Sequence, residues 1–197
     1  AVRNTPKDRQ YTAAHELNSQ PHPVPMSTND PFTVALLPGH NADDPGASTS
    51  EGWSEFPFTA LLAERIAHRL ERTSGLRPRM FYRPSEGGLS ELIQHLHEQK
   101  SEIDAALSLH FNAAQGKRGR SHGYCLHPPM ASETDTADVA LAESITYAVP
   151  SPGGTRVKHR TPGDVGVNPA LLRPEQNFAF PVVLDEPFFL DNPGALK

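Results

Sequence analysis

The sequence contains a single cysteine, Cys125, and this scarcity excludes both an internal disulfide framework and a cysteine-rich zinc site. No run of apolar residues approaches the roughly 20 that are needed to cross a bilayer, so we expect no transmembrane segment. The chain also lacks a dense basic run, and its formal net charge is −5, which argues against nucleic acid as a partner. Its 197 residues, of which 37% are hydrophobic, suffice for one globular domain with a substantial core.

The first 31 residues differ in composition from the rest of the chain. Aliphatic residues are few there, and prolines lie among Asn, Ser, Gln and Thr, at Pro6, Pro21, Pro23, Pro25 and Pro31. Such a segment cannot bury enough apolar surface to offset the entropy that is lost when it becomes ordered. We therefore predict a flexible tail or linker over residues 1–31 and a single domain over residues 32–197.

Hydrophobic periodicity predicts strands that alternate with helices in this domain. Residues 33–37 form a short continuous apolar run, which is typical of a strand covered on both faces. The pattern predicts further strands at 79–83, 105–109, 122–126 and 180–184, and helices at 54–75, 89–100 and 138–149. This alternation indicates an α/β domain with a mostly parallel twisted sheet and helices on both faces. Residues 150–178, which are rich in Pro and Gly, are expected to form a long irregular loop.

Chemically active side chains lie at or near the ends of the predicted strands. His40 follows the first strand, His110 follows the strand at 105–109, and Asp185-Glu186 follows the last strand. Glu55 lies in the first turn of the helix after the first strand. Because ligands gather at the carboxyl ends of parallel strands, we expect these side chains to lie close together. Two imidazoles and a carboxylate match a catalytic zinc site with one open position, and a second carboxylate would serve as general base.

Each of these residues alone also has an ordinary explanation. A histidine after a strand is more often a turn or surface residue. A carboxylate in the first turn of a helix, such as Glu55, stabilises the helix dipole, and Asp185-Glu186 fits an ordinary solvated pair. Only their joint arrangement at one edge of one sheet indicates a metal site.

Five short motifs in this order resemble the zinc-dependent N-acetylmuramoyl-L-alanine amidases of the type 3 family, which cut peptidoglycan. The resemblance covers residues 33–194. The matching segments are LLPGHNADDPGA, SEFPFTALLAERIAHRLE, MFYRPSE, AALSLHFNAA and FPVVLDEPFFLDNP. AALSLHFNAA is the closest match, because the family's strand ends in Ser-x-His-x-Asn-Ala.

The resemblance implies a ligand set and a reaction. His40, Glu55 and His110 would bind one Zn²⁺ ion, and Glu186, six residues before Asn192, would be the catalytic carboxylate. The domain at 32–197 would then be an amidase-like catalytic domain. Its substrate would be peptidoglycan, cut at the amide between N-acetylmuramic acid and the L-alanine of the stem peptide. The implied location is the cell envelope, with a periplasmic, secreted or phage-encoded lytic enzyme.

Two further residues are candidates for substrate binding, and three positions depart from the family pattern. Asn112 matches a polar position beside the second histidine, and Arg160 is a cation able to receive a stem-peptide carboxylate. Leu37 stands where the family has Asp, which removes a hydrogen bond toward a ligand. Asn41 replaces a common Gly, and Pro187 follows the catalytic position. These departures keep two alternatives open: a non-catalytic peptidoglycan-binding module, and a zinc amidohydrolase acting on another amide.

Overall fold

The computed structural model describes residues 30–86, 88–112, 123–129, 135–148, 158–165, 169–187 and 189–190. The predicted tail over residues 1–31 lies outside this part of the chain except for its last two residues, so that domain boundary stays a prediction. No helix in the described ranges has both the length and the apolar composition that a membrane span requires.

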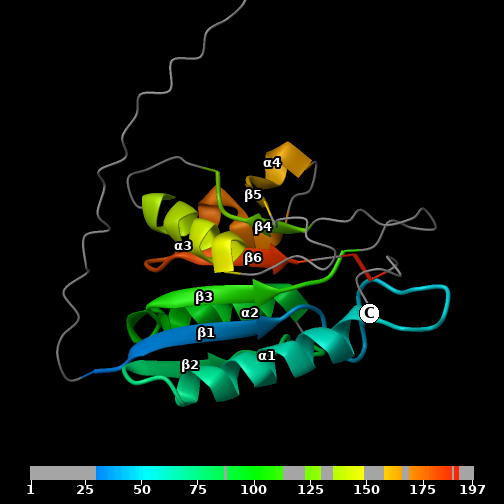
Figure 1. Cartoon of the computed structure of the whole chain (residues 1–197), viewed down its shortest axis with the longest axis horizontal. Helices are drawn as coiled ribbons and strands as arrows, with labels where there is room; N and C mark the ends of the chain where they lie inside the picture. Colours follow the sequence, from blue (N-terminus) through cyan, green and yellow to red (C-terminus); the bar gives the residue numbers. More distant parts are fainter. Residues whose placement is uncertain are drawn as a thin grey trace, which may run out of the picture. The chain divides into compact units, whose positions relative to one another are not determined.

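Within the described residues, six strands form one sheet in the order β2-β1-β3-β6-β4-β5 (Figure 1). β1 (Phe32–Pro38), β2 (Leu76–Met80), β3 (Ala105–Leu109) and β6 (Val182–Glu186) run parallel to one another. β4 (Tyr124–Leu126) is antiparallel to β6, and β5 (Lys158–Arg160) runs parallel to β4. The predicted mostly parallel sheet is confirmed, and β6, which comes last along the chain, lies inside the sheet.

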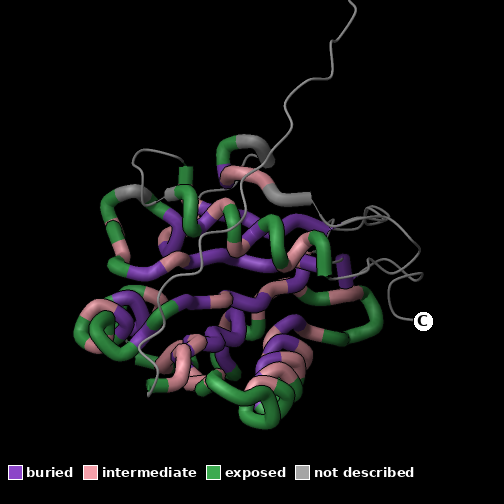
Figure 2. The backbone as a smooth tube through the Cα atoms, turned by 60° about the vertical axis from the view of Figure 1, so that its left-hand side comes forward, coloured by how far each residue is buried: buried purple, intermediate pink, exposed green. Residues whose placement is uncertain are grey.

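Helices cover both faces of this sheet, as predicted. α1 (Glu55–Glu71) and α3 (Asp135–Ala148) lie on one face, and α2 (Gly88–Glu98) lies on the other (Figure 1). Side chains alternate along a strand, so Leu36 packs under α1 while its neighbour Leu37 packs with the residues of α2. The four inner strands β1, β3, β6 and β4 are buried along most of their length (Figure 2), whereas the edge strand β2 has no buried residue. The core therefore holds the strand ends in fixed positions.

The structure corrects the predicted bounds of two strands and the prediction of one irregular loop. β2 spans 76–80 and not 79–83, because its pairing with β1 starts at Phe32 opposite Leu76 and includes Pro78. β6 spans 182–186 and not 180–184, so Glu186 is the last residue of the strand and does not follow it. The predicted irregular loop at 150–178 is wrong in its described part, which contains β5, α4 (Pro162–Val165), η2 (Ala170–Leu172) and η3 (Pro174–Gln176). Elements of three or four residues are too short to show a hydrophobic period.

Candidate metal centre

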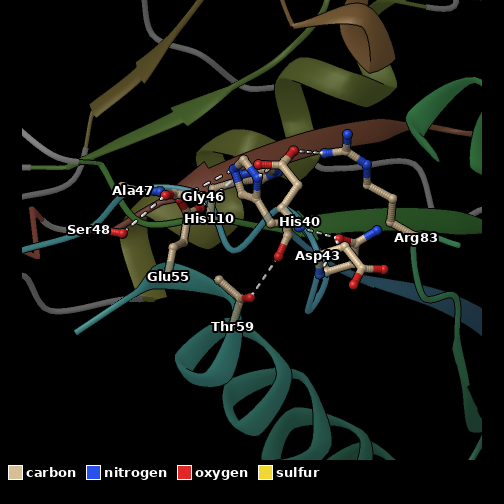
Figure 3. Close-up of polar contacts among 12 residues, drawn as sticks. His40, Asp43, Gly46, Ala47, Ser48, Glu55, Thr59, Arg83 and His110 are labelled. Atoms are coloured by element: carbon tan, nitrogen blue, oxygen red, sulfur yellow. Dashed lines mark hydrogen bonds and ion pairs between the residues drawn. The ribbon is translucent and has the colours of Figure 1, made fainter. Parts of the chain in front are cut away.

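Four predicted site residues meet at one edge of the sheet. His40 lies two residues beyond β1, His110 directly follows β3, and Glu186 ends β6. β1, β3 and β6 are adjacent parallel strands, so their carboxyl ends share one edge. Glu55 is the first residue of α1 and reaches the same place. Together these four residues line one open pocket, and Figure 3 shows three of them, His40, Glu55 and His110.

His40, Glu55 and His110 form a group of the size that a metal ion needs. One ligand atom from each of the three lies within 4.8 Å of the others. The Nδ1 atom of His110 lies 2.9 Å from Oε1 of Glu55, and Nε2 of His40 lies 3.4 Å from Oε2 (Figure 3). Glu55 thus bridges two imidazoles whose ring centroids are 5.3 Å apart. The structure brings the three predicted ligands together as a group that could hold one metal ion.

The surroundings of Glu55 keep its carboxyl group ionised. Its side chain is only 3% exposed, and this burial works to raise its pKa. The hydrogen bond to His110 and the charge of that ring lower the pKa and so oppose the effect of burial. The backbone N–H groups of Phe111 and Ala47 also lower it, each by donating a hydrogen bond of 2.9 Å to the carboxylate. The balance leaves the pKa of Glu55 below its ordinary value. A carboxylate is the form in which Glu binds metal.

Two glycines let the backbone approach the side chains of the three candidate ligands closely. A Cβ atom at Gly46 would lie 2.5 Å from Cδ2 of His40 and 2.6 Å from Oε2 of Glu55. A Cβ atom at Gly39 would lie 2.6 Å from Nδ1 of His110. Gly46 also has a φ of +78°, a left-handed conformation that favours glycine. The pocket therefore has room for His40, Glu55, His110 and an ion only because positions 39 and 46 carry no side chain. The two imidazoles and the carboxylate are a donor set that fits a metal.

Glu186 lies in the same pocket but outside the group of three ligands. Asn112 donates a hydrogen bond from Nδ2 to Oε2 of Glu186 at 2.8 Å, which fixes that carboxylate. Burial raises the pKa of Glu186, and the charge of Glu55 adds to this, against the opposing effects of His110 and Asn112. A carboxyl group with a raised pKa is a stronger base than an ordinary Glu, which suits it to take a proton and return it. Asp185, by contrast, is paired with Cys125 on β4 and does not line the pocket.

Arg160 is not brought to this pocket. It is paired with Leu126 on β4, which in turn is paired with Leu184 on β6, two residues before Glu186. Because β4 and β5 run antiparallel to β6, the carboxyl end of β5, where Arg160 lies, points away from the sheet edge that holds His40, His110 and Glu186. The predicted contact of Arg160 with substrate gains no support from this arrangement.

Sequence reasoning missed the loop that completes the site. Gly46, Ala47 and Ser48 line the pocket beside the ligands, and Ala47 supplies a backbone donor to Glu55. The donor from Phe111 was missed as well. Backbone N–H groups carry no signal of their own in a sequence. The Gly46-Ala47 pair, which ends the matching segment LLPGHNADDPGA, was the available hint.

Comparisons with known proteins agree with this geometry. A family model described as N-acetylmuramoyl-L-alanine amidase matches residues 34–197. Among solved structures, an N-acetylmuramoyl-L-alanine amidase from Clostridium difficile 630 has a TM-score of 0.67 at 19% identity, covering 85% of this chain and 84% of that one. The catalytic domain of CwlV, an amidase from Bacillus (Paenibacillus) polymyxa var. colistinus, has a TM-score of 0.63 at 18% identity, covering 84% of each chain. AmiC2 of Nostoc punctiforme has a TM-score of 0.63 at 16% identity, covering 82% of each chain.

These structural likenesses, at such identities, show the fold. No curated protein sequence matches the chain significantly. Because the family model spans most of the sequence, the chain belongs to the N-acetylmuramoyl-L-alanine amidase family, and the prediction of a peptidoglycan amidase is confirmed.

Proposed function

We propose that this enzyme hydrolyses the amide bond between N-acetylmuramic acid and the L-alanine of the stem peptide, with one zinc ion held by His40, Glu55 and His110. The observation that carries the proposal is the convergence of these three side chains and a fourth, unligated Glu186 in one pocket. Two imidazoles and one carboxylate form a donor set that catalytic zinc sites use, with a position left open. A bound zinc ion supplies Lewis acidity, which polarises the scissile carbonyl and makes a water molecule more acidic.

Glu186 is the proposed general base and then general acid. Its carboxylate takes the proton of the attacking water, and the same carboxyl group then gives that proton to the departing amine of L-alanine. The burial that raises the pKa of Glu186 suits both halves of this cycle. Asn112 has an orienting role, since its hydrogen bond keeps one oxygen of Glu186 in place. These steps yield a glycan strand and a free stem peptide.

The location follows from the substrate. Peptidoglycan lies in the cell envelope, so we place the enzyme's action there, whether it is periplasmic, secreted or part of a phage lysis system.

The test is the release of new N-terminal L-alanine from purified peptidoglycan. Wild-type protein loaded with zinc is expected to release it, and a chelator should stop the release. Glu186→Gln keeps the size of the side chain and should lower the rate about 10²- to 10⁴-fold while zinc still binds. Glu51→Gln, at an exposed glutamate outside the pocket, is the matched control and should keep wild-type activity.

Each contrary result has a defined meaning. Zinc-loaded wild type that binds peptidoglycan without releasing L-alanine would overturn the amidase proposal in favour of a binding module. Release of a different amino terminus would indicate a zinc hydrolase of another amide. Full activity of Glu186→Gln would remove the assigned role of that residue.

A further inference from the structure

The second ring nitrogen of His40 lacks the partner that a metal-binding histidine usually has. Nε2 of His40 faces Glu55, whereas Nδ1 is buried and has no hydrogen-bond partner among the described residues. Histidines that bind metals almost always donate their other N–H to a carboxylate or a carbonyl. Leu37, at the position of the family's acid, is 1% exposed in the hydrophobic core and has no polar group to offer.

The carboxylate of Asp44 lies beside this unpartnered nitrogen. Its Oδ2 atom is 3.6 Å from Nδ1 of His40, a few tenths of an ångström beyond a hydrogen bond. Asp44 reaches this place from four residues after the histidine, because the chain turns back on itself after β1. The turn is closed by a backbone hydrogen bond of 3.1 Å from the N–H of Asn41 to the carbonyl of Asp44.

Two other residues fix Asp44 where it stands. Nη1 of Arg83, which follows β2, lies 3.0 Å from Oδ2 of Asp44. The side-chain oxygen of Asn41 accepts hydrogen bonds from the backbone N–H groups of Asp43 and Asp44, at 3.1 and 2.7 Å. The amide nitrogen of Asn41 donates to the carbonyl of Pro84 at 3.0 Å and so ties this turn to the segment after β2. Figure 3 shows Arg83 reaching toward the loop that follows His40.

We propose that Asp44 is a positioning residue of the metal site, which accepts the Nδ1–H of His40 and so directs the lone pair of Nε2 toward the ion. Arg83 acts through Asp44, by holding its carboxylate near the ring. Asn41, the residue that replaces a family glycine, builds the turn that carries Asp44. This inference rests on the proposed function, because it takes His40 as a metal ligand.

The experiment measures zinc affinity by competition with a chromogenic chelator. Asp44→Asn should weaken zinc binding about 10- to 100-fold, the usual effect of losing a partner of a ligand histidine. Arg83→Gln should weaken it less, and the double variant should match Asp44→Asn alone, because Arg83 acts only through Asp44. Asp43→Asn changes the net charge equally at the adjacent position and should bind zinc like wild type.

The melting temperature of the metal-free protein separates positioning from folding. It should be similar in wild type and in all variants, since Asp44 is exposed over 55% of its side chain. If Asp44→Asn is unstable, Arg83→Gln supplies the second measurement, and wild-type affinity in that variant would overturn the proposal.

The outcomes also distinguish this inference from the proposed function. Wild type that binds no zinc would overturn both. Wild type and Asp44→Asn that bind zinc equally well would overturn the role of Asp44 and leave the zinc amidase standing. An equal loss in Asp43→Asn would reveal a general charge effect and would also overturn the role of Asp44.

Discussion

Asp185 is a buried carboxyl group whose ionisation should weaken the fold. It lies on β6 with 4% of its surface exposed, and its Oδ1 atom has no hydrogen-bond partner among the described residues. Burial, together with the charge of Glu186 beside it, raises the pKa of Asp185 to about 7. In the unfolded chain the same group has its ordinary pKa of 3.8.

The direction of the resulting pH dependence follows from proton binding. Between these two pKa values the folded protein holds a proton that the unfolded chain has released, so the free energy of unfolding falls as pH rises. This decrease in the free energy of unfolding is nearly absent below about pH 4 and complete above about pH 7. At about 1.4 kcal/mol per pKa unit, the difference between 3.8 and about 7 corresponds to about 4 kcal/mol. That is a large share of the stability of an ordinary domain.

Asp185→Asn removes the titration while it keeps the shape of the side chain. Urea unfolding of metal-free protein gives the free energy of unfolding of the variant and of wild type. The difference between the two proteins should grow in favour of the variant, by up to about 4 kcal/mol, from about pH 4 to about pH 8. The comparison cancels other groups, such as Glu55, that titrate in both proteins. Asp43→Asn, at an exposed site, is the control and should follow wild type at both pH values. A difference in the free energy of unfolding between Asp185→Asn and wild type that does not change with pH would refute the reasoning.

Two other predictions rest on close packing and on burial. Gly46→Ala should abolish zinc binding in calorimetry, because its Cβ would overlap His40 and Glu55, whereas Gly52→Ala should bind normally. Gly52 has a φ of +86° and nothing near its Cβ position, so Gly52→Ala has a similar backbone cost, roughly 1–2 kcal/mol, without the overlap. Equal zinc binding by both variants would contradict the role of Gly46. Cys125 is fully buried, and burial with the charge of Asp185 raises the pKa of its thiol. A disulfide reagent should therefore label it only after unfolding, and rapid labelling of native protein would show that the strand opens.

The clustering of the three candidate ligands was predictable because it depends on strand ends. Buried parallel strands show as continuous apolar runs, and the residues just beyond them, such as His40 and His110, must lie at one edge of the sheet. Glu55 followed from the helix start in the same way. Local pattern and sheet geometry are enough to place these residues together, whereas the metal-binding role came from the family resemblance.

The remaining features depend on contacts that leave no local pattern. The three residues of β5 show no period, and nothing in the sequence gives the direction of β4, so the place of Arg160 in the sheet could not be predicted. The ion pair between Asp44 and Arg83 joins positions 39 residues apart, on a loop and after an edge strand. Its existence follows only from how the turn at Asn41 folds.

The place of β6 inside the sheet has a consequence for the order of synthesis. Among the described strands β6 is the last to be synthesised, yet it alone joins β3 to β4 in their backbone ladder. Until it is made, β4 and β5 have no hydrogen-bonded connection to the strands that carry His40 and His110. The same strand ends in Glu186. A nascent chain therefore gains Glu186, the proposed base, only with the strand that joins the two parts of the described sheet.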